Sequence, residues 1–244
     1  MNLILVGRVQ LSNYNLNSYN NVELRIRDTK NAFLELVKKK HFTKIIIADS
    51  SNVEIFTSKE ILEIEEKYQI KIEQQVYFSK DHIDKNGGIK SASELVNIHK
   101  VLSDSKLLLG SDSFYKITPR YDIVNLKHII EMSSDYSNFY FDFHFPPFSK
   151  IQKILVTSIF KESVNKIITL NLEDCLNFLD EPNGIYIEHL MFDLLRKSKR
   201  KYLKCEFPII NTISGTTGVQ SSMNYFGIRD FFSKMGLMAF TTID

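Results

Sequence analysis

The sequence predicts an α/β protein built around a parallel β-sheet. Over the first 80 residues, apolar strand-like runs alternate with amphipathic helical stretches in the order strand, helix, strand, helix, strand. Strands joined through helices pair in parallel, with right-handed crossovers. The chain has 244 residues, of which 43% are hydrophobic and 25% charged, so it has the composition of a globular protein and the length to bury a substantial core.

The first three elements follow from the spacing of apolar residues. Leu3 to Val9, which begins with the apolar run Leu3 to Val6, predicts a buried strand. Residues 28–40 predict a helix in which Asp28 or Thr29 is the N-cap and an apolar face follows at helical spacing. The β-branched run from Lys44 to Ala48 predicts a second buried strand.

A polar loop after the second strand gives the first candidate site. Asp49 and Ser50 come directly after the apolar run. Ligands of parallel α/β sheets bind at the carboxyl ends of strands, so these two residues are expected to face a ligand. The same residue types favour turns, and a plain turn explains them equally well.

Two further elements complete the predicted unit. Residues 58–68 predict a helix with Ser58 as its cap and Leu62 among its apolar residues, and residues 70–78 alternate like a strand. The glycine pair at 87–88 then leads into another helix. Such a pair could let a phosphate approach free helix N–H groups, but a flexible loop also explains it, and we favour the loop.

The densest group of reactive side chains lies between Phe114 and Tyr121. If this stretch is a short strand, Lys116, Thr118 and Arg120 share one face, because strand side chains alternate. Two cations and a hydroxyl suit an anionic ligand such as a phosphate. The alternative is an amphipathic edge strand whose basic face meets water.

Candidates for acid–base chemistry lie in the second half of the chain. Residues 184–201 predict a helix with Glu188 and His189 near its start, and either side chain could accept a proton from a sugar hydroxyl. Alternation in an aromatic-rich stretch places Asp142 and His144 on one side of a strand. A helix-start charge, a packing histidine and a polar strand face explain the same residues without catalysis.

Two segments near the C-terminus suit anionic partners. The small-residue loop around Gly215 and Thr216 allows close backbone approach and could form an anion nest, although a mobile surface loop explains it as well. A run of five cations usually marks a solvated helix end but can also touch anionic lipid head groups. Its members are Arg196, Lys197, Lys199, Arg200 and Lys201.

Charge and composition exclude several protein classes. The net charge of +2 gives no indication of nucleic-acid binding, and the sequence has no apolar run of about 18 residues that could span a bilayer. Its two cysteines show neither a disulfide framework nor metal-ligand spacing. We expect a cytoplasmic protein, with peripheral contact at the inner face of the membrane through the cationic run.

Taken in order, four segments resemble a group of bacterial glycosyltransferase-like proteins from capsule and lipopolysaccharide biosynthesis loci. The segments are a strand that ends in an acidic polar loop (residues 45–51), a glycine-rich turn into the helix that carries Glu94, a variant of the group's F-K-I-T-G-R-Y pattern with Pro119 where glycine is usual (residues 114–121), and Glu188-His189 followed by the small-residue loop at 214–218.

The resemblance implies a GT-A-like fold in one domain over residues 1–244. Its mostly parallel, Rossmann-like sheet is flanked by helices, and a C-terminal helical and loop region receives the acceptor. Residues 1–125 are expected to form the nucleotide-binding half and residues 126–244 the acceptor-binding half. The implied activity moves a sugar from a nucleotide-sugar, of UDP type, to a glycan or lipid-linked acceptor during synthesis of a surface polysaccharide.

Within this interpretation each candidate residue has a role. Asp49 contacts the nucleotide base or ribose, and Lys116 and Arg120 hold the phosphates. The full set of candidate donor-binding residues is Asp49, Ser50, Lys116, Arg120, Gly215 and Thr216. The candidate general bases, in order, are Glu188, Asp142 and His189.

The sequence lacks the Asp-x-Asp motif with which many GT-A enzymes hold a divalent ion and a diphosphate. Ser111-Asp112-Ser113 stands near the expected place but offers a single carboxylate. Either Asp112 or Asp142 binds a metal with further partners, or Lys116 and Arg120 neutralise the diphosphate without a metal. We favour the second alternative.

Two other functions compete with a glycosyltransferase. A degenerate transferase fold could serve as a non-catalytic assembly partner in a polysaccharide-synthesis complex, which the missing Asp-x-Asp motif would allow. A sugar nucleotidyltransferase would ordinarily show a glycine-rich, basic loop directly after the first strand. Here Gly7-Arg8 is followed by residues 10–21 without a second glycine, which makes this function less favoured.

Overall fold

The structure is a computed structural model that describes residues 1–7, 21–50, 53–77, 90–143, 154–164, 200–203, 208–211 and 240–243. The fold of these residues is α/β, as predicted. Its strands are β1 (Asn2–Gly7), β2 (Lys44–Asp49), β3 (Lys71–Val76), β4 (Ser113–Ile117), β5 (Asp122–Ile123), β6 (Asn138–Phe143), β7 (Ile154–Ser163), β8 (Arg200–Leu203), β9 (Ile210–Asn211) and β10 (Phe240–Ile243). Its helices are α1 (Val22–Lys38), α2 (Ser58–Tyr68), α4 (Lys90–Asp104) and α5 (Leu126–Ser133).

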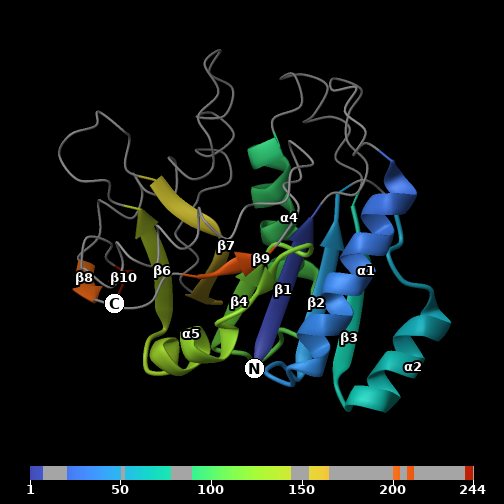
Figure 1. Cartoon of the computed structure of the whole chain (residues 1–244), viewed down its shortest axis with the longest axis horizontal. Helices are drawn as coiled ribbons and strands as arrows, with labels where there is room; N and C mark the ends of the chain where they lie inside the picture. Colours follow the sequence, from blue (N-terminus) through green and yellow to red (C-terminus); the bar gives the residue numbers. More distant parts are fainter. Residues whose placement is uncertain are drawn as a thin grey trace.

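The first half of the main sheet is parallel. β1 pairs with β2 on one side and with β4 on the other, and β2 pairs with β3. These strands are the apolar runs that the sequence predicts, and the central residues of β1 and β2 are buried. The strands therefore end at one common edge, which we call the carboxyl edge and which lies at the top of the sheet in Figure 1.

The second half of the sheet is antiparallel, so the prediction of a mostly parallel sheet is wrong for this half. The full order is β3-β2-β1-β4-β7-β6-β10-β8, and β7 runs antiparallel to both β4 and β6. β10 pairs antiparallel with β6 and β8. Antiparallel pairing leaves no need for a covering crossover helix, so the helical rhythm on which the sequence prediction rests is absent from this half.

The helix N-caps differ from the predicted ones. α1 begins six residues before the predicted start, because the Asn21 side chain accepts a hydrogen bond from the Leu24 N–H at 3.1 Å. Thr29, one of the predicted caps, is instead buried within the helix. α2 is capped by Thr57 in a reciprocal capping box with Glu60, one residue before the predicted Ser58.

The sheet buries two different faces. Leu5, Ile47 and Ile117 face a core that includes Phe33 of α1 and Ile129 of α5, and we call this the α1 face. Because strand side chains alternate, the intervening residues face the other side, where α4 packs against β1 and β2; this is the α4 face. Figure 1 shows α1 and α4 on the two sides of the sheet.

Most of the predicted late helix lies outside the described residues. Its last two residues, Arg200 and Lys201, lie in β8 and pair with Ile243 and Thr242 of β10, so the prediction of helix as far as residue 201 is wrong. Nothing among the described helices combines the length and the apolar character needed to cross a bilayer.

Candidate functional site

The end of β2 places Asp49 and Ser50 at the carboxyl edge. Both are buried, with exposed fractions of 3% and 2%. The Ser50 N–H donates to the Gly7 carbonyl at 3.2 Å, and the Tyr77 N–H donates to the Asp49 carbonyl at 2.8 Å, so the backbone is fixed from both neighbouring strands. Asp49 follows Ile45 and Ile47 in the alternation, which puts its side chain on the α1 face.

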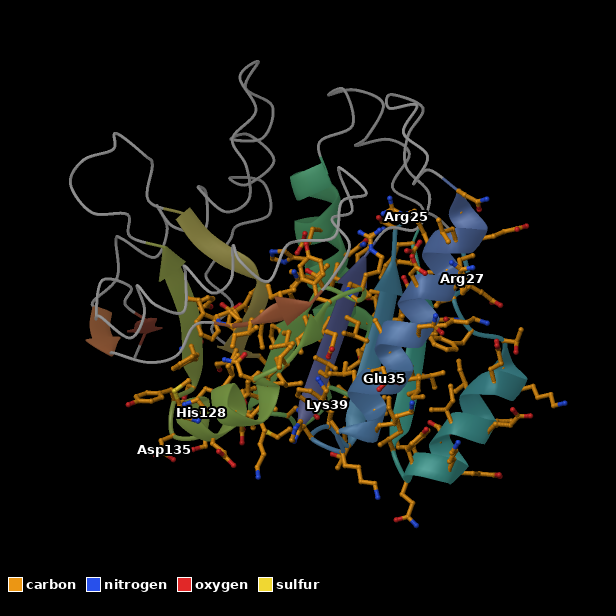
Figure 2. The ribbon with its side chains drawn as sticks, viewed as in Figure 1. Arg25, Arg27, Glu35, Lys39, His128 and Asp135 are labelled. Carbon is orange, nitrogen blue, oxygen red and sulfur yellow. The ribbon has the colours of Figure 1, made fainter. Side chains whose placement is uncertain are left out.

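α1 brings a buried arginine to the same end of that face. Arg25 lies in the first part of the helix and is 1% exposed, which makes it the largest fully buried side chain among the described residues. It continues the inward stripe of Thr29 and Phe33 toward the carboxyl edge, and Figure 2 shows it at that end of α1, whereas Lys39 lies at the other. Buried arginines are rare in proteins, so this edge holds charge that packing alone does not require.

Lys116 of β4 lies on the α4 face and is fully buried, with an exposed fraction of 0%. β4 pairs with β1 on one side and with β7 on the other, so the alternative of an edge strand whose basic face meets water is wrong. The Lys116 ammonium donates to Oε1 of Glu94 on α4 and to the Thr118 hydroxyl at 3.2 Å. It also lies 5.8 Å from the centre of the Phe160 ring. Lys116 and Thr118 are therefore together, as the alternation predicts, but a carboxylate already neutralises the lysine.

Arg120 does not continue the strand. β4 ends at Ile117, and the Tyr121 N–H donates to the Thr118 carbonyl at 3.0 Å to close a turn, so the strand alternation does not reach Arg120 and the predicted strand over 114–121 is too long. Pro119 packs tightly against Gly7, where a Cβ would lie 2.8 Å from the proline ring. A side chain at position 7 would displace this turn, which explains the glycine at the end of β1.

Two polar residues of α4 complete the α4 face of the site. Glu94 holds Lys116, and its side chain is 18% exposed. Asn97, three residues further along, is 1% exposed, and within the described part of the chain neither its Nδ2 nor its Oδ1 has a hydrogen-bond partner. Glu94 enters the sequence interpretation only as part of the family resemblance, and Asn97 does not enter it at all. Their only sequence signal is that both share the helical stripe of the buried Ile98 and Val101.

A buried tyrosine closes this face on the antiparallel side. Tyr140 of β6 stacks on Phe160, with 5.5 Å between the ring centres. Burial raises the pKa of the Tyr140 phenol well above its usual value, and the neighbouring Glu162 raises it further. The phenol therefore stays protonated and does not serve as a base.

The remaining candidates are placed only in part. Asp142 lies in β6, opposite Leu155 of β7, and its side chain is outside the described part of the structure. Glu188, His189, Gly215 and Thr216 also lie outside the described residues, as do Arg196, Lys197 and Lys199. The candidate base and the small-residue loop thus stay predictions.

The proposed metal position at Asp112 does not fit the site. Asp112 is exposed and precedes β4, so it lies at the amino end of that strand, opposite the carboxyl edge. Within the described residues no three histidine, cysteine or carboxylate side chains cluster as metal ligands. A surface hollow lined by Thr43, Leu62 and Lys71 also lies away from the carboxyl edge, because Thr43 and Lys71 stand at the amino ends of β2 and β3.

No protein-family model and no curated protein matches the chain. Among solved structures, it is similar to HddC from Yersinia pseudotuberculosis, with 12% sequence identity and a TM-score of 0.41. The alignment covers 94% of this chain and 99% of HddC. A TM-score this low extends nothing from HddC to this chain.

Proposed function

We propose that this protein binds a nucleotide-sugar at the carboxyl edge of β1, β2 and β4 and transfers its sugar to a glycan or lipid-linked acceptor, on a GT-A-like fold. The observation that supports a site here is the burial of charged groups at the end of parallel strands: Arg25 and Asp49 on one face, Lys116 and Glu94 on the other. Ligands of parallel sheets bind at this edge. The transferase chemistry and the polysaccharide acceptor rest on the family resemblance of the sequence segments.

The chemistry requires three tasks of the protein. The nucleotide must be held, and Asp49 and Ser50 lie at the strand end where a base or ribose would be contacted. Negative charge develops on the diphosphate as its bond to the sugar breaks, and Arg120, in the turn that follows β4, is the cation we assign to it. A base must take the proton of the acceptor hydroxyl, for which Glu188, Asp142 and His189 are the candidates.

The structure changes one earlier assignment. Lys116 and Arg120 were expected to act together as a cationic clamp, but Lys116 is fully buried and bonded to Glu94. A lysine that forms an ion pair with a carboxylate adds little net attraction for a phosphate, because the two charges cancel. We therefore assign the phosphates to Arg120 and give Lys116 a role through Glu94.

A thermal-shift and calorimetric series against UDP, GDP, CMP and their sugar conjugates, with and without Mn²⁺, tests the proposal. The wild type is compared with Arg120→Ala, Asp49→Asn and the control Lys127→Ala, whose side chain is 77% exposed on α5. We expect one nucleotide to stabilise the wild type and the control, and to lose at least about tenfold in affinity in the other two variants. If no nucleotide binds the folded wild type, the proposal fails and a non-catalytic assembly partner takes its place.

A further inference from the structure

The side of α4 that faces the sheet carries the carboxylate of Glu94, which the buried Lys116 of β4 holds in place. Lys116 donates to Oε1 of Glu94, and within the described part of the chain no hydrogen bond reaches Oε2. The lysine is 0% exposed and the glutamate 18% exposed. The buried ammonium thus fixes the carboxylate while leaving one of its oxygens available to accept a hydrogen bond.

Asn97 adds a second polar group beside this carboxylate. It is 1% exposed, and both ends of its amide lack hydrogen-bond partners among the residues that the structure describes. Buried amides are normally paired, because burial removes their bonds to water. Residues three apart are neighbours on a helix, and helical side chains lean toward the N-terminus, so the amide of Asn97 lies toward the turn of Glu94.

This pair stands at the carboxyl edge rather than deep in the sheet. α4 begins at that edge (Figure 1), and it packs against β1 and β2. Lys116 lies one residue before the end of β4, so the residue that Glu94 contacts is close to the same edge. The Glu94–Asn97 pair and the end of β2 therefore border the same region from opposite faces of the sheet.

We propose that Glu94 and Asn97 bind a pair of neighbouring hydroxyls on the nucleotide-sugar, either of its ribose or of its transferred sugar, and that Lys116 is the positioning residue that holds Glu94. The proposal rests on the proposed function. A carboxylate accepts a hydrogen bond from one hydroxyl, and an amide both donates to and accepts from the next. Hydroxyls suit this pair better than phosphates, because the more exposed member of the Lys116–Glu94 ion pair is the anion.

The test compares ligands that differ by these hydroxyls. Dissociation constants are measured by calorimetry for UDP, GDP and CMP, for their 2′-deoxy forms, and for UDP-glucose, GDP-mannose and CMP-N-acetylneuraminate. The proteins are the wild type, Glu94→Gln, Asn97→Leu and the control Glu63→Gln, whose side chain is 65% exposed on α2. Melting temperatures without ligand are recorded for all four.

We expect the wild type and control to prefer the hydroxyl-bearing ligand by about tenfold, and both α4 variants to lose that preference. If the variants lose the preference for the ribose form over the 2′-deoxy form, Glu94 and Asn97 bind the ribose. If they lose the preference for the sugar conjugate over the bare nucleotide, they bind the transferred sugar. Asn97→Leu should melt no lower than the wild type, because it removes an amide that has no hydrogen-bond partner among the described residues.

Two results would overturn the assignment. If the wild type binds a nucleotide and both variants keep every preference, Glu94 and Asn97 are structural while the donor site stands. A sharply lowered melting temperature of Asn97→Leu with unchanged preferences leads to the same conclusion. If no probe binds the folded wild type, the proposed function fails, and this inference fails with it.

Discussion

Two buried lysines lie on adjacent strands and face opposite sides of the sheet. Lys116 of β4 is on the α4 face, and Lys161 of β7 is on the α1 face. Each ammonium lies over a ring of the other strand, at 5.8 Å from the centre of Phe160 and 5.6 Å from the centre of Tyr115. These rings belong to the residues that pair with the lysines in the ladder, so the two environments are alike up to this point.

Their hydrogen-bond partners differ in kind. Lys161 donates to the backbone carbonyls of Ser133 and Ser134 at 2.8 and 3.2 Å, where α5 ends, and there a cation also meets the negative end of the helix dipole. Lys116 donates to the side chain of Glu94, which is partly exposed and belongs to α4. Because the partners of Lys161 are backbone carbonyls, its contacts stabilise the fold alone. The partner of Lys116 is the side chain of Glu94, whose carboxylate can also accept a hydrogen bond from a ligand.

The largest predicted effect is that of Lys116→Met. Removing one member of a buried ion pair leaves the other without compensation, and the partial exposure of Glu94 places the expected loss of unfolding free energy at about 3 kcal/mol, the lower end for such pairs. Adding Glu94→Leu should restore most of this loss, because an apolar pair then replaces the ion pair. Urea denaturation of both single variants and the double variant measures the coupling, and purely additive losses would contradict the ion-pair interpretation.

Lys161→Met should cost less, at about 2 kcal/mol, since two carbonyls lose a charged donor. No second substitution should rescue it, because its partners are backbone atoms. The matched test adds Asp135→Asn, the exposed acid whose charge acts on Lys161. A rescue by Asp135→Asn as large as the rescue expected from Glu94→Leu would remove the distinction between the two lysines.

The parallel half of the fold could be predicted because each of its strands and helices is indicated by residues that are close together in the sequence. Each buried strand is a continuous apolar run such as Ile45–Ala48, and each helix shows its apolar stripe. The antiparallel half was predicted only in part. Alternation indicates the strand that carries Asp142, but residues 151–160 fit a strand or a helix equally well, and no helical interruption shows how these strands pair. Pairing of β4 with β7 joins residues such as Lys116 and Phe160, and no local pattern reports such a contact.

The candidate site was predicted in the same uneven way. Asp49 and Lys116 were found because they adjoin strong strand signals. Arg25 and Glu94 were not placed among the site residues. Arg25 stands before the predicted start of its helix, and a charged helix residue such as Glu94 ordinarily faces water. Only the packing of α1 and α4 on the sheet shows that these two turn inward. The neutralisation of Lys116 likewise depends on a contact between residues 94 and 116 that alternation within one strand cannot show.

The smallest predicted effect is a pH dependence that belongs to Lys161. Burial lowers the pKa of its ammonium below 10.5, and the nearby charge of Asp135 only partly opposes this. Between the folded pKa and 10.5 the unfolded chain binds the proton more fully than the folded protein, so the contribution of Lys161 to stability rises with pH in that window and is lost as pH falls through the folded pKa.

Urea denaturation of the wild type and Lys161→Met from about pH 8 to about pH 10 measures this dependence. The stability difference between them should widen as pH rises, because the variant has no proton to release at this position. Burial also raises the pKa values of Tyr115 and Tyr140. Both proteins retain these tyrosines, so their contribution largely cancels in the difference. A difference that stays constant over this range would mean that Lys161 keeps its charge in the folded protein as easily as in water, contrary to the effect expected from its burial.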